Sequence, residues 1–225
     1  MSDRFSDDAM KSIFIVDDHD IVRYGLEAVL KDIPEFRVLG YADNLSTAVS
    51  AVKHLQPDLL ITDMSLPDSH GLDTVRAMVQ AQGSRPVLVV SMHDELIYAE
   101  QVLGLGAQGY LMKEKAHEMI AQAAQVLLPG GRWVSQQVSS HLLNRLVHTR
   151  SRRPALDFAR SAPQALMSLR EVEVLEKIGR GKTTKEIAYS LELSPRTVDV
   201  HRASIKKKLG LRSGAEVVAF AVSRL

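Results

Sequence analysis

The first half of the chain alternates short apolar runs with amphipathic stretches. The apolar-rich runs, each four or five residues long, lie at 12–16, 36–40, 58–62, 86–90 and 109–112. They are too short for buried helices and have the length of buried strands. Between the first two runs, apolar residues recur at helical spacing (Val22, Leu26, Val29 and Ile33), and similar patterns follow later runs. This order predicts an α/β domain with a doubly wound, five-stranded parallel sheet covered by helices on both faces.

The second half carries helical patterns only, and a break separates the two halves. Pro129-Gly-Gly131 stops the last helix of the first half, and a short helix is expected over 136–146. The segment 149–163 is basic, contains prolines and lacks apolar periodicity, so we interpret it as a tether. We therefore divide the chain into a first domain (1–130), a short helix with a linker (131–163) and an all-α domain (164–225).

Capping signals predict three successive helices in the last domain. The first runs from Ser168 to about Gly179, and Thr183 or Thr184 can cap the second. Ser194-Pro195 starts the third, which Gly210 stops. Two helices followed by a third that begins after a short turn are typical of a helix-turn-helix fold.

The net charge of +1 hides an asymmetry between the halves. Residues 1–128 carry a net charge of −9, whereas residues 129–225 carry +10. This split indicates an acidic domain joined to one that binds nucleic acid or an anionic surface, with chance drift of charge as the alternative. The chain has no cysteine, which excludes disulfides and thiolate metal sites. It shows no signal-peptide pattern and no membrane-length apolar run, so we expect a soluble cytoplasmic protein without a membrane partner.

Carboxylates follow two of the predicted strands. Asp17 and Asp18 end the first strand and Asp63 ends the third. Because neighbouring parallel strands end at one edge of a sheet, these groups should share a pocket, where their repulsion calls for a hard cation such as Mg²⁺. Ser91 and Lys113 end the fourth and fifth strands and add donors. Such a pocket suits the formation of an aspartyl phosphate.

Two histidines border this pocket. His19 and His93 are potential metal ligands, but the surrounding ligands are carboxylates and no second soft ligand is present. We therefore expect both to be loop or cap residues rather than ligands.

A helical wheel divides the third helix of the last domain into two faces. Val198, Ile205 and Leu209 fall on one side, which should face the core. The other side carries cations and small apolar groups, namely Arg196, Val200, Ala203 and Lys207, flanked by Asp199 and Lys206. Cations that meet phosphates or guanine, and small groups that touch thymine methyls, suit a recognition helix in the major groove of double-stranded DNA.

The motifs of the first half resemble those of CheY-like receiver domains, which have a flavodoxin-like fold. The segments that carry the resemblance are 15–18, 61–67, 90–93 and 109–113, in the same order and spacing. The resemblance implies roles for seven residues: phosphoacceptor Asp63, direct Mg²⁺ ligand Asp18, water-mediated ligand Asp17, carbonyl ligand Ser65, phosphoryl-binding Ser91 and Lys113, and Tyr110, an aromatic that rotates with Ser91. Tyr110 is equally interpreted as an ordinary core residue.

The second half resembles the LuxR-type output domain, and the whole chain resembles NarL/FixJ response regulators. Arg170-Glu171, Lys185–Ala188, Thr197-Val198 and Lys208–Gly210 fit this pattern. The expected DNA contacts are Thr184, Lys185, Arg196, Thr197, Asp199, Val200, Ala203, Lys206 and Lys207. The resemblance also implies a cognate histidine kinase, a homodimer in the phosphorylated state and RNA polymerase as a further partner.

Three positions depart from the LuxR-type pattern. Thr184 stands where asparagine is common, and Asp199 and Ala203 stand where some members carry lysine, so base preference cannot be transferred. Asp199 either accepts a hydrogen bond from a cytosine amine or favours the helix dipole.

Two other functions are compatible with parts of this pattern. An aspartate-nucleophile phosphatase needs a second acid two residues after the nucleophile, where this chain has His19 or Ser65. We therefore expect no enzyme. A regulator whose receiver only dimerises or binds a partner, without phosphotransfer, remains the alternative.

Overall fold

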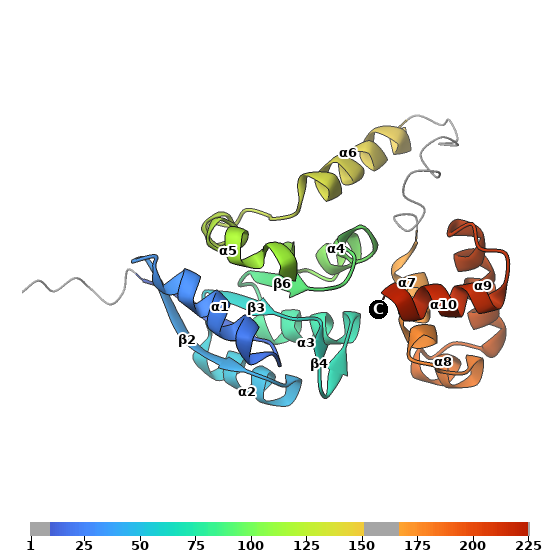
Figure 1. Cartoon of the computed structure of the whole chain (residues 1–225), viewed down its shortest axis with the longest axis horizontal. Helices are drawn as coiled ribbons and strands as arrows, with labels where there is room; N and C mark the ends of the chain where they lie inside the picture. Colours follow the sequence, from blue (N-terminus) through green and yellow to red (C-terminus); the bar gives the residue numbers. More distant parts are fainter. Residues whose placement is uncertain (1–9, 151–166, 225) are drawn as a thin grey trace, which may run out of the picture. The chain divides into compact units, whose positions relative to one another are not determined.

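The computed structural model describes residues 10–150 and 167–224, which form two compact units (Figure 1). Of the described residues, 10–92 and 102–135 form the first unit, and 93–101, 136–150 and 167–224 form the second. The predicted tether lies almost entirely within 151–166, outside the described residues. Within the described ranges no helix is both long and apolar enough to cross a bilayer.

The first unit is built on a five-stranded parallel sheet in the order β2-β1-β3-β6-β7. The strands are β1 (Lys11–Val16), β2 (Phe36–Ala42), β3 (Leu59–Thr62), β6 (Val87–Ser91) and β7 (Gly109–Met112). Each lies within two residues of its predicted place. Every residue of β3 and β6 is buried, because helices cover both faces of the sheet. The predicted fold class is confirmed.

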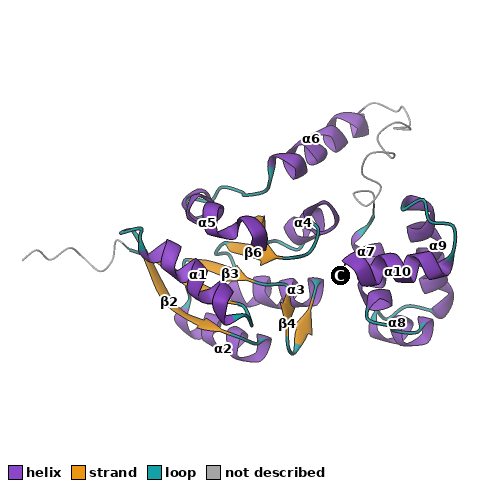
Figure 2. Cartoon of the chain, viewed as in Figure 1, coloured by secondary structure: helices purple, strands orange, loops and turns teal. Residues whose placement is uncertain are grey.

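Helices connect the strands and form the outer layers (Figure 2). They are α1 (Asp20–Lys31), α2 (Leu45–Leu55), α3 (Leu72–Gln82) and α5 (Lys113–Leu127). α4 (Glu95–Gly104) follows β6 in the chain, and most of it is assigned to the second unit. α1 packs beside α5, and α2 packs beside α3. Leu26 and Leu30 of α1 and Ile120 of α5 meet apolar side chains of β1, β3 and β6 in one core.

Two features of this unit were not predicted. β4 (Ser65–Leu66) and β5 (Ser69–His70) form a small antiparallel hairpin directly after Asp63. After the predicted stop at 129–131, the chain returns to β7: Trp133 forms a parallel bridge with Gly109, and its carbonyl accepts from Tyr110 N at 2.9 Å. A Cβ on Gly109 would lie 3.1 Å from the Trp133 carbonyl oxygen, so glycine permits this approach.

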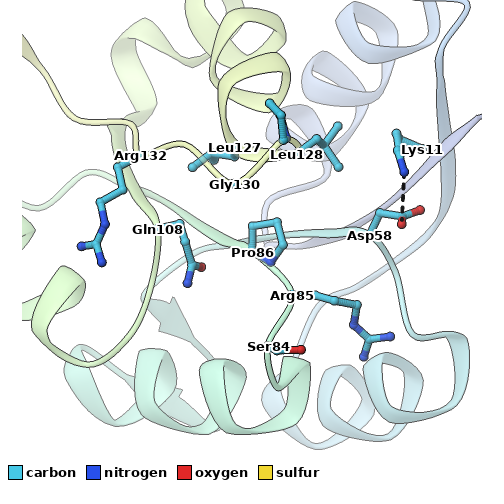
Figure 3. Close-up of a pocket in the computed structure, with 11 residues that line it drawn as sticks. Lys11, Asp58, Ser84, Arg85, Pro86, Gln108, Leu127, Leu128, Gly130 and Arg132 are labelled. Carbon is cyan, nitrogen blue, oxygen red and sulfur yellow. Dashed lines mark ion pairs between the residues drawn. The ribbon is translucent and has the colours of Figure 1, made fainter.

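A hollow of about 510 Å³ lies at the amino ends of these strands (Figure 3). Lys11 and Asp58 stand 4.0 Å apart on its rim, and the Ser12 hydroxyl donates to Asp58 at 2.6 Å. Arg85 and Arg132 add two further cations. The predicted carboxylate pocket lies at the opposite ends of the strands, so the two sites are separate.

Besides most of α4, the described part of the second unit contains α6 (Gln136–Arg150) and four helices after the tether. These are α7 (Leu169–Gly179), α8 (Thr184–Ser190), α9 (Pro195–Lys208) and α10 (Gly214–Arg224). α9 packs against α7, α8 and α10. Their shared core includes Val172, Leu175, Ile187, Val198, Ile205 and Ala221, all buried.

The predicted caps account for the helix boundaries of the second unit. Ser168 and Thr183 each form a capping box, with Glu171 and Glu186 respectively. Thr183 is therefore the cap of α8, and the alternative prediction of Thr184 is wrong, because Thr184 is the first helical residue. α6 extends four residues beyond its predicted end, to 150.

Candidate functional site

The structure brings the three predicted carboxylates together at the carboxyl ends of β1 and β3. These strands are neighbours, so Asp17 and Asp18 lie beside Asp63. Asp17 and Asp63 are 1% and 4% exposed, whereas Asp18 is open to solvent. One oxygen of each carboxylate and one ring nitrogen of His19 all lie within 4.8 Å of one another. Oxygen donors at this density fit a hard divalent cation such as Mg²⁺.

Lys113 supplies a positive charge inside this pocket. It is the first residue of α5, directly after β7, and its Nζ lies 2.6 Å from Asp17 Oδ2 and 2.7 Å from Asp63 Oδ2. Burial tends to lower the pKa of Lys113, but the hydrogen bonds to both carboxylates outweigh it and raise this pKa above its ordinary value. The ammonium therefore stays charged and neutralises part of the acidic cluster.

Asp63 is held in a single orientation. Its Oδ1 accepts from the backbone N–H of Met64 at 2.6 Å, while Oδ2 faces Lys113. Burial raises the pKa of Asp63, Lys113 opposes that shift, and the charge of Asp17 adds to it, with a raised pKa as the net result. A buried carboxylate with a raised pKa is a characteristic of reactive sites.

The other predicted pocket residues lie in the same region of the fold. Ser91 ends β6 and is fully buried, and Tyr110 in β7 is 1% exposed. That burial is common to the core and switch interpretations of Tyr110, so both remain. Ser65 begins the β4–β5 hairpin, and its backbone hydrogen bond to Asp63 lowers the pKa of that carboxyl. The roles of Ser65, Ser91 and Tyr110 remain predictions.

Arg23 is a pocket residue that the sequence reasoning missed. It is 8% exposed, donates from Nη1 to the backbone carbonyl of Asp17 at 2.6 Å and forms an ion pair with Asp20. Its guanidinium lies 5.0 Å from the ring centre of Tyr41. These contacts fix the loop that carries Asp17 and Asp18. The i,i+3 spacing of Asp20 and Arg23 on α1 was the available signal.

His19 lies at a predicted kind of position, but its side chain makes contacts that were not predicted. It occupies the N-cap position of α1, as expected, but its side chain forms no capping hydrogen bond. Instead, its Nδ1 lies 2.7 Å from Asp18 Oδ1 and 3.1 Å from Asp17 Oδ1.

α9 presents the predicted polar face to solvent. Val198 and Ile205 are buried and Leu209 is half-buried, whereas Arg196, Val200, Ala203 and Lys207 are exposed. Asp199 is exposed as well, and Lys206 and Thr197 are half-buried. The side chain of Val200 is apolar but 62% exposed, so it contributes little to the core of the free protein.

A basic hollow of about 460 Å³ lies elsewhere in the same unit. Four cations line it: Lys177, Arg180, Lys182 and the predicted contact Lys185. Tyr189, which is 91% exposed, stands among them. Sequence reasoning missed the first three because they lie before α8, outside the predicted recognition helix.

Glu171 joins α7 to α9. Its carboxylate accepts from Lys208 Nζ and Ser204 Oγ, each at 2.6 Å, and from the Ser168 amide at 2.6 Å. Burial tends to raise the pKa of Glu171, but these hydrogen bonds lower it to about 2. The glutamate therefore stays ionised and holds α9 against the rest of the unit.

Comparison with known protein families finds one family in each half of the chain. Residues 13–125 match the response regulator receiver domain. Residues 165–221 match the bacterial regulatory proteins of the luxR family.

Relatives match over nearly the full chain. The transcriptional regulatory protein DegU of Brevibacillus brevis is 30% identical, over 92% of this chain and 90% of its own. The oxygen regulatory protein NreC of Staphylococcus carnosus is 31% identical, over 94% of this chain and 97% of its own. RcsB of Salmonella enterica, solved on promoter P1flhDC with the phosphomimetic BeF₃⁻, has a TM-score of 0.70 at 24% identity and covers 95% of this chain and 98% of its own. That likeness shows a shared fold.

Proposed function

We propose, because this chain belongs to the two-component response regulators with a LuxR-type helix-turn-helix, that Asp63 is its phosphoacceptor and α9 its DNA-reading helix. The observation that carries the first part is the buried Asp63 carboxylate, oriented by the Met64 amide and paired with Lys113. One oxygen of Asp63 would attack the phosphorus of a phosphohistidine on a cognate kinase. The P–N bond then breaks, and the histidine leaves with the electron pair.

The residues around Asp63 divide the tasks of this transfer. Asp17, Asp18, Asp63 and the carbonyl of Ser65 would hold Mg²⁺, which supplies positive charge to the phosphoryl oxygens when bound. Lys113 is released from Asp63 when that oxygen is esterified, and its ammonium can then pair with the phosphoryl group. Ser91 ends the adjacent strand as a hydroxyl donor. Charge added at this point biases the fold between two packing arrangements.

The regulator would act in the cytoplasm on paired DNA half-sites as a phosphorylated homodimer, with RNA polymerase as a further partner. The exposed residues of α9 and the expected contacts Thr184 and Lys185 at the start of α8 support a DNA surface. The basic hollow described above would add phosphate contacts from Lys182. Regulation of transcription, rather than turnover of a substrate, is the activity that we propose.

Phosphorylation of Asp63 is testable with acetyl phosphate and Mg²⁺. The wild-type chain should incorporate acid-labile phosphate, and Asp63→Asn should incorporate none while its circular dichroism spectrum is unchanged. Asp73→Asn, which alters an exposed aspartate of α3, is the matched control and should label normally. Equal labelling of Asp63→Asn would place the acceptor elsewhere, and no labelling of the wild type would favour a receiver that works without phosphotransfer.

The DNA-reading assignment of α9 is testable by two substitutions with different expected signatures. Lys207→Ala should weaken binding to all sequences and reduce the slope of log K against log salt by about one, because a phosphate contact is lost. Val200→Ala should change base preference at one position, by about 1 kcal/mol or more. Lys31→Ala on α1 serves as the control. Unchanged binding in both α9 variants would contradict the assignment.

A further inference from the structure

The imidazole of His19 is directed to the carboxylates of the acidic pocket rather than to the helix that it precedes. As the N-cap residue of α1 it makes no side-chain bond to the helix backbone. Its Nδ1 lies 2.7 Å from Asp18 Oδ1 and 3.1 Å from Asp17 Oδ1, and its backbone N–H also donates to Asp17 Oδ1 at 2.9 Å. The ring nitrogen therefore occupies the same small volume as the carboxylate oxygens.

These separations match the coordination shell of a six-coordinate ion. With metal–ligand bonds of about 2.1 Å, adjacent ligands of an octahedron lie about 3.0 Å apart and opposite ligands about 4.2 Å apart. The contacts of Nδ1 with the two aspartates have the spacing of adjacent ligands. The ligand atoms of Asp17, Asp18, His19 and Asp63 all lie within 4.8 Å of one another. This distance is only slightly longer than the separation of opposite ligands. Small side-chain movements would close it around an ion.

Lys113 leaves the His19 side of this set available. Its ammonium contacts Oδ2 of Asp17 and Oδ2 of Asp63, whereas His19 faces Oδ1 of Asp17 and Oδ1 of Asp18. Asp17 is thus shared between a cation on one oxygen and the imidazole on the other. Nδ1 donates to these carboxylates when no ion is present. Because the His19 side chain is 64% exposed, its ring can carry its proton on Nε2 instead, so that Nδ1 offers its lone pair to an ion that replaces this hydrogen bond.

We propose that His19 is a nitrogen ligand that gives this pocket added affinity for divalent transition ions such as Co²⁺ and Zn²⁺, but none for Mg²⁺. Imidazole nitrogen coordinates these borderline ions well, whereas Mg²⁺ selects oxygen donors. This inference rests on the metal pocket of the proposed function and adds a residue that discriminates between metals. A histidine that only orients the two carboxylates would instead affect every ion alike.

The test compares Co²⁺ with Mg²⁺ on the full-length chain, purified without a histidine tag. Binding is followed by calorimetry, and Co²⁺ also by its visible absorption, which changes when an oxygen ligand is replaced by nitrogen. His19→Ala should weaken Co²⁺ about tenfold or more and Mg²⁺ less than twofold. His19→Asn, which keeps a polar donor but is a poorer ligand, should bind Co²⁺ as weakly as His19→Ala. His117→Ala alters an exposed histidine of α5 and should bind both ions normally.

Each other outcome would overturn the inference. An equal loss of both ions, with recovery in His19→Asn, would make His19 an orienting residue. Unchanged Co²⁺ binding in both variants would show that His19 does not bind the ion, and Co²⁺ binding that survives Asp18→Asn would lie at another site.

Mg²⁺-dependent phosphorylation of His19→Ala separates this inference from the proposed function. If His19→Ala is phosphorylated normally, Asp63 remains the acceptor whatever its metal preference.

Discussion

At the scale of single residues, the buried cation Arg23 ties the acidic loop to the first helix. Its bond to the Asp17 carbonyl is made where water has little access, whereas its ion-pair partner Asp20 is open to solvent. Charged hydrogen bonds contribute more in such places than on the surface, and leaving their partners unpaired is costly. Arg23 therefore links the geometry of the pocket to the stability of the fold.

We predict that Arg23→Met lowers the free energy of unfolding of the first unit by about 2 kcal/mol. Methionine retains much of the apolar stem but supplies no donor to Asp17. Lys31→Ala removes an exposed i,i+4 ion pair from the same helix and should change the free energy by less than about 0.5 kcal/mol. Urea unfolding of the full chain measures both. Equal effects would show that the Asp17 contact is not stabilising.

Only those residue positions in the pocket that follow from the geometry of the strands could be predicted from the sequence. Asp17, Asp18 and Asp63 could be grouped because parallel neighbours end at one edge of the sheet. The contact of Lys113 with Asp17, and the turn of His19 toward the carboxylates, depend on side-chain rotamers that no sequence period encodes. Arg23 was missed because its contacts join α1 to the Asp17 carbonyl and to Tyr41 of β2, and no sequence period pairs these positions.

At the scale of elements, α9 is anchored by one glutamate of α7. Glu171 caps its own helix and binds Lys208 and Ser204 of α9. Glu186 forms the same kind of capping box in α8, but it is exposed, and its ion pair with Lys182 joins it only to the residue just before its own helix cap. Substitution of the two glutamates therefore compares the stability contributed by a cap within one helix, Glu186, with that of a cap that also joins two helices, Glu171.

We predict that Glu171→Gln destabilises the second unit by about 2 kcal/mol at neutral pH, whereas Glu186→Gln has a clearly smaller effect. The folded pKa of Glu171, about 2, lies below its ordinary value. Its contribution is therefore complete above pH about 4.5 and is lost as the pH falls toward 2. Thermal unfolding between pH 3 and 7 should show the two curves, wild type and Glu171→Gln, converging on the acid side. Parallel curves would contradict this linkage.

Element boundaries were predicted best where a cap or glycine defines them. Ser168, Ser194 and Gly210 gave the limits of α7 and α9 within a residue or two. The β4–β5 hairpin was missed because two-residue strands carry no periodicity. α6 was predicted too short because its last turns are polar, and polarity alone does not end a helix.

At the scale of the whole molecule, the opposite charges of the two halves should affect DNA binding. The first 128 residues carry −9 and the remainder carries +10, so the tethered acidic half competes electrostatically with DNA for the basic half. We predict that a fragment from about Ala155 to Leu225 binds a half-site more tightly than the unphosphorylated full-length chain. The comparison requires one ionic strength and concentrations at which both are monomeric. Equal or weaker binding by the fragment would leave dimerisation as the switch.

The sequence allowed the order of domains and the family to be predicted, because strand ends and caps act locally. The operator sequence and the identity of the kinase depend on partners, and the chain alone does not encode their surfaces.

The bridge between Trp133 and β7 provides an intrinsic fluorescent probe of this strand. Trp133 is the single tryptophan of the chain, and its carbonyl accepts from the backbone of Tyr110. Three residues after Tyr110, the same strand delivers Lys113 to the two carboxylates. A shift of β7 during phosphorylation would change the surroundings of one indole ring. Its emission spectrum would then follow the event in real time, in an unlabelled and unmutated protein.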